Sequence, residues 1–376
     1  MKFVILSLGT GGGHNAAAEA ICQALQNEGA EAKVYDGLAI SNPLCSQLVC
    51  GAYAGLARHS PRLFGAIFNF SFHITSRRRK SVVYAANVQS AGRLADFLNA
   101  EKPDGVICTH VFCVQQLTYL RRHSLLNVWS AGVITDYAVQ PFWEEEEIDC
   151  VFTPSEELSE RYAQNGLPRE VLKSCGIPVD PSLTEVTDLR AAKMAAGLNP
   201  DRRHVIAAGG SMGAGRMFPM IRALVDGLPA DIQIIAVCGN NEALAEQLKK
   251  LEIPVERLKI IGYQRPLHRL IRAADVFVSK PGGLSSTEAF AQRVPFVASH
   301  PIAGLEHNNA AYIRAKGAAL CPETDEEIVK AVARLLSDPE LAAQMKKAQR
   351  ALVPVSASRA IACACLAACG GKTQDL

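Results

Sequence analysis

Several features that mark other protein classes are missing from this 376-residue sequence. It has no apolar run of the roughly 20 residues that a membrane-spanning helix needs, so we expect a soluble or peripheral protein. The short apolar run at its N-terminus ends in glycines and lacks a small-residue cleavage site, which indicates a buried strand rather than a signal peptide. Most of the 12 cysteines are scattered through apolar stretches, where free thiols behave as small hydrophobes, and the run Cys363, Cys365 and Cys369 lacks the paired spacing and the histidines of a zinc site. The formal net charge of +2 does not indicate a partner.

Acidic residues are missing from one long stretch, between Asp36 and Asp96. Basic residues are interleaved there with aromatic ones, and the residues we expect to bind a membrane are Arg58, Arg62, Phe64, Phe68, Phe72, Arg77, Arg78, Arg79 and Lys80. Such a surface inserts shallowly among lipid headgroups, where each basic residue contributes about 1 kcal/mol near an anionic leaflet. Two alternatives stay open: a buried helix pair with a solvated basic tip, and a nucleic-acid patch, although no known nucleic-acid-binding module accompanies it.

Short strand-like runs alternate with helical patterns through most of the chain, which predicts an α/β protein with parallel sheets and covering helices. The predicted strands are residues 2–8, 32–35, 105–109, 128–134, 150–153, 172–175, 204–208, 232–237, 258–261, 276–279 and 295–298. A plan of strand, glycine turn and helix occurs at the N-terminus and again after His204. This repetition favours two Rossmann-like units over one long sheet.

The boundary between the two units is expected in the proline-containing connector at residues 176–181. We therefore predict a first domain over residues 1–178 and a second over residues 179–350. After Leu335 the pattern is helical to about Leu366. A helix of that length could cross back, so residues 351–376 are predicted to pack on the first domain.

The first glycine turn, Gly9-Thr-Gly-Gly-Gly-His14, follows a strand and opens a helix. Glycines allow the backbone to approach a ligand, and a helix N-terminus offers free N–H groups to an anion. A dinucleotide-binding turn would need glycine where His14 stands. Because its ordinary pKa is near 6.5, a histidine there is a candidate general base. The alternative is a histidine that only hydrogen-bonds the loop.

The most specific segment begins at Lys280-Pro-Gly-Gly283 and continues through Leu-Ser-Ser-Thr to Glu288. It follows a predicted strand and begins a helix with hydroxyl side chains in its first turn, an arrangement suited to a diphosphate. Glu288 can accept two hydrogen bonds from a ribose. The second glycine turn, Gly209-Gly210-Ser211, is expected to lie near it, because the carboxyl ends of parallel strands share one edge of a sheet. The alternative is an ordinary helix start with serine and threonine caps.

These segments together resemble the monogalactosyldiacylglycerol synthase and processive diacylglycerol glucosyltransferase family, relatives of the peptidoglycan transferase that acts on lipid I. The resemblance covers nearly the whole chain and rests on the order and spacing of its motifs. They are the glycine loop with His14, the segment from Thr135-Asp136-Tyr137 to Trp143, residues 154–157, residues 176–180, Gly209-Gly210-Ser211, Lys280 to Glu288, and Glu306 with Asn309.

The resemblance implies a GT-B fold, with the acceptor in the first domain, a UDP-sugar in the second and the chemistry in a cleft between them. It implies an inverting, metal-independent transferase that moves a hexose from the UDP-sugar, a co-substrate, to a membrane lipid, with diacylglycerol expected first. No further cofactor and no nucleic acid are expected. The expected location is the cytoplasm, peripherally on the inner face of the cell membrane, and the basic aromatic stretch corresponds to the family's membrane-docking region.

The resemblance also implies roles for individual residues. His14 would deprotonate or orient the acceptor hydroxyl, with Asp136 as the rival base. Glu288 would hold the ribose, the backbone near Tyr263 would face uracil, and Glu306 and Asn309 would bind the sugar. The full set expected at the donor is Gly12, Gly13, Gly210, Ser211, Asn240, Tyr263, Gly283, Ser285, Ser286, Thr287, Glu288, Glu306 and Asn309.

Two positions depart from the family pattern. Leu305 stands where glutamine commonly precedes the sugar-binding glutamate, which leaves the sugar open. Gln140 stands where histidine often follows the aspartate by four residues, which leaves the acceptor open. Alternatives therefore include a polyprenyl-linked or sterol-like acceptor, a UDP-sugar-binding regulator without turnover, and a UDP-N-acetylglucosamine epimerase. A nicotinamide-dependent oxidoreductase would explain Asp36 but not His14.

Overall fold

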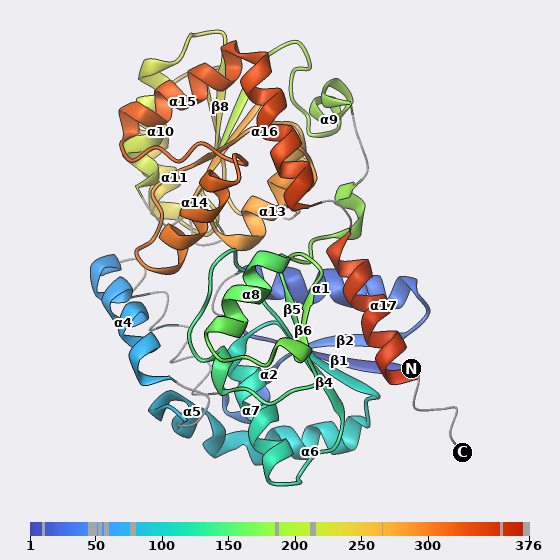
Figure 1. The fold of residues 1–376 in the computed structure, drawn as a ribbon. Coiled ribbons are helices and arrows are strands. Elements are labelled where there is room, and N and C mark those ends of the chain that lie inside the picture. Colours follow the sequence, from blue (N-terminus) through green and yellow to red (C-terminus); the bar gives the residue numbers. More distant parts are fainter. Residues whose placement is uncertain are drawn as a thin grey trace. The chain divides into compact units, whose positions relative to one another are not determined.

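The computed structural model describes residues 1–9, 12–43, 51, 55, 60–75, 80–184, 188–210, 216–264, 266–353 and 356–370. Several predicted site residues lie outside these ranges: Ser211, Arg58, Arg77, Arg78 and Arg79. For Arg62 and Phe64 only the backbone is described. The chain divides into two compact units, Met1–Pro181 with Val355–Leu376, and Ser182–Pro354 (Figure 1).

The first unit is built on a parallel sheet of six strands in the order β2-β1-β3-β4-β5-β6. The strands are β1 (Lys2–Ser7), β2 (Glu31–Asp36), β3 (Gly105–Cys108), β4 (Trp129–Val133), β5 (Cys150–Thr153) and β6 (Leu172–Ser174). Successive side chains of a strand point to opposite faces. Accordingly, Phe3 and Ile5 of β1 join one apolar core, while Val4 and Leu6 join another.

Helices cover both faces of this sheet. The helices of this unit are α1 (Gly12–Asn27), α2 (Gly37–Ser41), α4 (Pro61–Ile74), α5 (Val82–Asn87), α6 (Ala91–Glu101), α7 (Val111–Arg122), α8 (Glu156–Gln164) and α17 (Ala357–Gly370). Short 3-10 turns occupy Val88–Ser90, Trp143–Glu145 and Arg169–Val171. From the far end of the chain, α17 packs beside α1 and places Ile361, Ala362 and Cys365 in the same core as Phe3.

The second unit repeats the plan with a parallel sheet of five strands in the order β11-β10-β7-β8-β9. The strands are β7 (His204–Ala208), β8 (Gln233–Val237), β9 (Leu258–Ile261), β10 (Val276–Ser279) and β11 (Phe296–Ala298). A short 3-10 turn at Pro181–Thr184 leads into this unit. Its helices are α9 (Leu189–Ala195), α10 (Met217–Gly227), α11 (Glu242–Lys249), α12 (His268–Arg272), α13 (Gly283–Ala291), α14 (Leu305–Ala315), α15 (Asp325–Ser337) and α16 (Pro339–Leu352). All predicted strands are present, and their ends agree to within one residue.

The prediction of one continuous helix from Leu335 to about Leu366 is wrong, because α15, α16 and α17 are separate. Asp338 ends α15, and its side chain accepts a hydrogen bond from the N–H of Leu341 at 2.9 Å as the cap of α16. Pro339 follows at the first helical position. Proline is tolerated there because a backbone N–H at that position would have no partner inside the helix. A second separation follows Leu352, so that α16 lies in the second unit and α17 in the first.

One stretch, Pro339–Gly370, is long and apolar enough by length and composition to cross a membrane, with 38% of its most apolar window buried. It is the exception to the expectation that no such run exists. The stretch contains α16 and α17, which belong to different units and contribute Met345 and Ile361 to two separate cores. Core helices of folded domains pass the same test of composition.

Candidate active site

The first cluster of candidate residues lies at the carboxyl edge of the first sheet, where open parallel α/β sheets bind ligands. His14 follows β1 in the first turn of α1, which begins with Gly12 and Gly13. Thr109 and His110 follow β3, and Thr135 and Asp136 follow β4. Because β1, β3 and β4 are consecutive neighbours in the sheet, these three connections meet.

The ring of His14 is fixed by its neighbours. Its Nδ1 lies 2.7 Å from the carbonyl oxygen of Thr109 and 3.2 Å from the hydroxyl of Thr135. A carbonyl only accepts hydrogen bonds, so we assign the ring hydrogen to Nδ1 and the lone pair to Nε2. Burial lowers the pKa of His14, and the hydrogen bond to Thr109 partly opposes that effect. The ring is therefore neutral at pH 7, and its Nε2 can accept a proton.

A second histidine, His110, lies against His14, and the sequence analysis missed it. The two ring centroids are 4.7 Å apart, with the rings edge to face at 71°. His110 caps α7, where its Nδ1 accepts the N–H of Phe112 at 3.2 Å. Burial, followed by the charge of His14, holds the pKa of His110 well below its ordinary value. Two neutral imidazoles therefore lie side by side. The pair could not be predicted from a sequence motif, because it forms only when β1 lies beside β3.

Asp136, the rival base, is buried with an exposed fraction of 8%. The side-chain amide of Gln140 donates to its Oδ2 at 2.7 Å, and the oxygen of that amide accepts the indole N–H of Trp143 at 3.2 Å. Trp143 packs against β4 at Gly132, where an added Cβ would lie 2.5 Å from the indole ring. Gln140, the residue that departs from the family pattern, thus orients Asp136 and holds it to a buried tryptophan.

Three successive carboxyl groups, those of Glu144, Glu145 and Glu146, are buried beyond Trp143. Burial raises the pKa of each of them. Glu145 accepts the backbone N–H of Ser81 at 2.9 Å, and the ammonium of Lys80 donates to the carbonyl of Glu145. Lys80, predicted to face a membrane, is thus half-buried and held to this loop. Within the described residues, no group of three or more His, Cys, Asp or Glu side chains is placed to hold a metal ion.

Helix α4 carries the described part of the predicted membrane-binding stretch. Phe68 and Phe72 are half-buried, with their rings 5.5 Å apart. The exposed apolar side chains are instead Leu63, Ile67 and Phe70, with exposed fractions of 53%, 48% and 62%. Their spacing of four and three residues places all three on one face of the helix. The structure shows which apolar side chains the exposed face of α4 presents, and membrane binding by this segment stays a prediction.

The second cluster lies at the carboxyl edge of the second sheet. The chain turns back between β9 and β10, so that β7 and β10 flank the topological switch point, where doubly wound sheets bind ligands. Gly209 and Gly210 follow β7, and Lys280 follows β10. Gly210 has φ +71°, and an added Cβ would lie 3.1 Å from Cε of Lys280. The glycine turn therefore lies directly under the lysine side chain.

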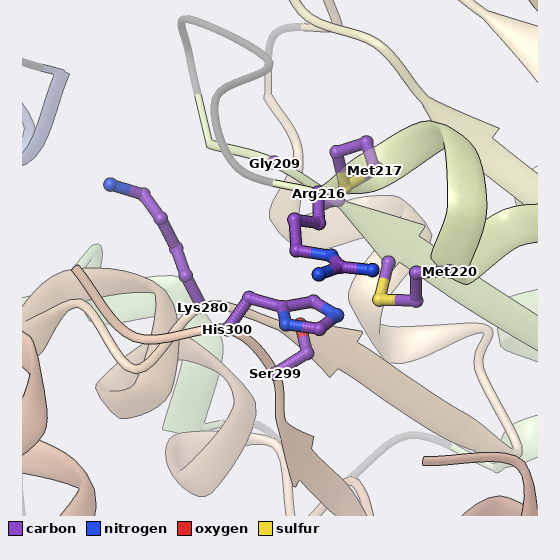
Figure 2. A pocket seen from close by; sticks show the side chains of 8 residues that line it. Gly209, Arg216, Met217, Met220, Lys280, Ser299 and His300 are labelled. Atoms are coloured by element: carbon purple, nitrogen blue, oxygen red, sulfur yellow. The ribbon is translucent and has the colours of Figure 1, made fainter. Parts of the chain in front are cut away.

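A pocket opens at this switch point and is lined by Ala208, Gly209, Arg216, Met217, Met220, Lys280, Ser299 and His300 (Figure 2). The ammonium of Lys280 pairs with Oε1 of Glu306 at 2.7 Å, while Oε2 of Glu306 accepts the N–H of Ile302 at 2.8 Å. Asn309 is buried, and its amide donates to the carbonyl of Pro281 at 3.0 Å. Glu306 and Asn309 are thus anchored to the segment that follows β10.

Helix α13 begins at Gly283, with Gly282 as its N-cap. Ser286 and Thr287 are fully buried, and the hydroxyl of Thr287 donates back to the carbonyl of Gly283 at 2.6 Å. Ser285 and Glu288 are half-buried. Of the three predicted hydroxyls at the start of α13, only that of Ser285 is therefore on the accessible side, together with Glu288.

The remaining predicted donor residues follow the other two strands of this sheet. Asn240 is exposed beyond β8, after Gly239 with φ +58°, and Tyr263 is 52% exposed beyond β9. Neither lines the pocket at the switch point. Both lie at the same carboxyl edge, however, because all five strands are parallel.

Comparison with known families assigns a different family model to each half of the chain. Residues 14–179 match monogalactosyldiacylglycerol (MGDG) synthase, and residues 223–352 match glycosyl transferases group 1. The processive diacylglycerol beta-glucosyltransferase of Bacillus subtilis (strain 168) is 27% identical over 92% of this chain and 90% of its own length. The enzyme of the same name from Bacillus cytotoxicus is 29% identical over 92% of this chain and 88% of its own.

Solved structures of similar fold can be superposed on nearly the whole chain. MurG of Acinetobacter baumannii superposes with a TM-score of 0.63 at 16% identity, covering 97% of this chain and 99% of that one. The spinosyn rhamnosyltransferase SpnG, complexed with thymidine diphosphate, has a TM-score of 0.64 at 14% identity over the same shares. HepE of Anabaena in complex with UDP-glucose has a TM-score of 0.59 at 14% identity, covering 99% of this chain and 100% of that one. The fold is therefore GT-B, as the sequence predicted.

Proposed function

Because the chain is a GT-B glycosyltransferase of the monogalactosyldiacylglycerol synthase and processive diacylglycerol glucosyltransferase family, we propose that it transfers a hexose from a UDP-sugar to diacylglycerol in a membrane. The observation that carries the proposal is the neutral His14 at the carboxyl edge of the first sheet, with its lone pair assigned to Nε2. It lies in the half of the chain that matches the MGDG synthase family.

In the proposed reaction the hydroxyl of diacylglycerol attacks the anomeric carbon of the sugar. His14 accepts the hydroxyl proton at Nε2 as the new C–O bond forms, and the bond from carbon to the diphosphate oxygen breaks on the opposite face. UDP leaves with the bonding electrons, and the anomeric configuration inverts. Asp136 is the rival base, but its Oδ2 already accepts the amide of Gln140.

The donor is proposed to bind the second unit without a metal. The N-terminus of α13, Gly210 and Ser285 would receive the diphosphate, because free helix N–H groups stabilise an anion there. Glu288 would hold the ribose, and the backbone near Tyr263 would face uracil. Glu306 and Asn309, already anchored beside Lys280, would bind the sugar.

Contact with the lipid is proposed for the outer face of α4. Leu63, Ile67 and Phe70 would enter the headgroup region, and the neighbouring basic residues would lie near anionic lipid. The location that we propose is therefore peripheral, on the inner face of the cell membrane. It supplies a reason for the exposed apolar side chains that a purely soluble enzyme would not.

The test supplies UDP-glucose and UDP-galactose in separate reactions to anionic vesicles, with and without diacylglycerol, and measures glycolipid product by mass spectrometry. We expect product with one of the two sugars, only with diacylglycerol, and in the presence of EDTA. A polyprenyl-lipid arm tests the other acceptor class. UDP binding without product from any acceptor would contradict transfer and favour a regulator.

A further inference from the structure

Asp325 joins two basic residues at the pocket of the second unit, and none of the three belongs to the donor residues proposed above. Asp325 lies in the first turn of α15 and pairs through Oδ1 with Nε2 of His300 at 2.7 Å. Its other oxygen, Oδ2, pairs with the guanidinium of Arg216 at 3.2 Å. The loop after β11, the start of α10 and the start of α15 are thus held together by one carboxylate.

The two basic side chains line the pocket at the switch point of the sheet, beside the backbone of Gly209. Figure 2 shows the guanidinium of Arg216 and the ring of His300 next to each other, while the ammonium of Lys280 points away from them. Lys280 is engaged by Glu306 at 2.7 Å. The pocket is therefore lined by two separate groups of side chains, Lys280 with its partner Glu306, and Arg216 with His300.

Arg216 keeps most of its hydrogen-bonding capacity for a ligand. Its side chain is 69% exposed, whereas Asp325 is 11% and His300 16% exposed. A guanidinium has five N–H donors, and the contact with Asp325 involves one nitrogen, Nη2. The remaining donors suit the paired oxygens of a phosphate. Asp325 and His300 are the buried, fixed part of the group, and Arg216 is its accessible end.

The backbone of His300 supports a specific role for this arrangement. Its φ is +43°, a left-handed conformation that a non-glycine residue rarely adopts because it is energetically unfavourable. The hydrogen bond to Asp325 holds the ring in that position. His300, the second residue of the loop between β11 and α14, is therefore held in an unfavourable conformation beside the pocket.

We propose that Arg216, positioned by Asp325 and His300, binds the second phosphate of the nucleotide donor, the phosphate that carries the sugar. The proposal rests on the proposed function. The cavity volume is only about 10 Å³, far below the roughly 300–1,000 Å³ of pockets that hold a drug-sized ligand, so this shallow site can face one group of the donor but cannot enclose the whole molecule. Asp325 and His300 are positioning residues, because Arg216 alone is exposed enough to reach the phosphate.

The test compares the binding of UDP and of UMP, which lacks the second phosphate, by titration calorimetry. We expect Arg216→Gln to weaken UDP binding about tenfold or more and to leave UMP binding unchanged, because only UDP reaches the guanidinium. Asp325→Asn should give a smaller loss of the same kind, and Arg216→Lys should recover part of the affinity for UDP. Arg222→Gln is the matched control, since Arg222 lies on the same helix, pairs with Asp226 at 2.8 Å and does not line the pocket.

Equal losses for UDP and UMP in Arg216→Gln, or no loss for either, would overturn the inference while leaving the donor site in the second unit. A wild-type protein that binds neither nucleotide would overturn the proposed function, and this inference with it. Circular dichroism of each variant separates a lost contact from a lost fold.

Discussion

Acid should destabilise the second unit through one histidine at the start of β7. His204 is fully buried, and neither of its ring nitrogens has a hydrogen-bond partner among the described residues. Its backbone N–H donates to Asp275 at 2.7 Å, and Lys193 pairs with the same carboxylate. Burial, followed by the charge of Lys193, lowers the pKa of His204 from 6.5 to about 4.

The sign and size of the effect follow from this pKa. The unfolded chain binds a proton at this ring once the pH falls below 6.5, whereas the folded chain does so only near pH 4, so stability is lost as the pH falls through that window. One pKa unit corresponds to about 1.4 kcal/mol, so the full loss is about 3 kcal/mol, of which about 2 kcal/mol has occurred by pH 5.

The assay is amide hydrogen exchange of peptides from β7 and β8, read by mass spectrometry. Tryptophan fluorescence would report the wrong unit, because Trp129 and Trp143 both lie in the first. His204→Leu and wild type are compared at each pH, which cancels the intrinsic pH dependence of exchange. We expect protection in wild type to fall about 30-fold relative to the variant between pH 7 and pH 5. The exposed His307→Leu is the control. A wild-type-to-variant ratio that stays constant over this range would refute the reasoning.

Three further predictions concern the proposed reaction. His14→Ala should lower kcat about 10²- to 10⁴-fold with UDP affinity unchanged, because it removes the base from the first unit; equal losses in both quantities would make His14 a binding residue. Glu288→Ala should weaken UDP binding by about 1–3 kcal/mol, measured by calorimetry, and normal binding would contradict the ribose role. Replacing Ile67 and Phe70 together by serine should reduce sedimentation with anionic vesicles and leave UDP binding intact, whereas unchanged sedimentation would return α4 to an ordinary surface helix.

The strands could be predicted from the sequence because each is a short β-branched or apolar run bounded by turn residues. The ends of β7, β9 and β10 agree with the prediction without a shift. Parallel sheets are covered on both faces, so their strands carry a strong and local signal. The C-terminal helices could not be separated from hydropathy alone, because the break depends on how Asp338 and Pro339 cap α16.

The site could be predicted only where a residue follows a strand within a motif. His14 and Glu288 were predicted in this way, and their roles stay predictions. The contact of His14 with His110 depends on the order of strands in the sheet, and the sequence does not state that order. Likewise, His300 lies in the loop after β11, and its partner Asp325 belongs to α15, 25 residues along the chain. Such pairs arise from the topology and carry no local signal.

The central claim is that this protein moves a sugar from UDP to diacylglycerol, and the amounts of the two products measured together test it most directly. UDP and glycolipid would be quantified in one reaction with UDP-glucose or UDP-galactose and diacylglycerol-containing anionic vesicles, and in a matched reaction without diacylglycerol. The account predicts equal amounts of UDP and glycolipid when diacylglycerol is present, and neither product when it is absent. UDP release without glycolipid, or no UDP release under either condition, would contradict it.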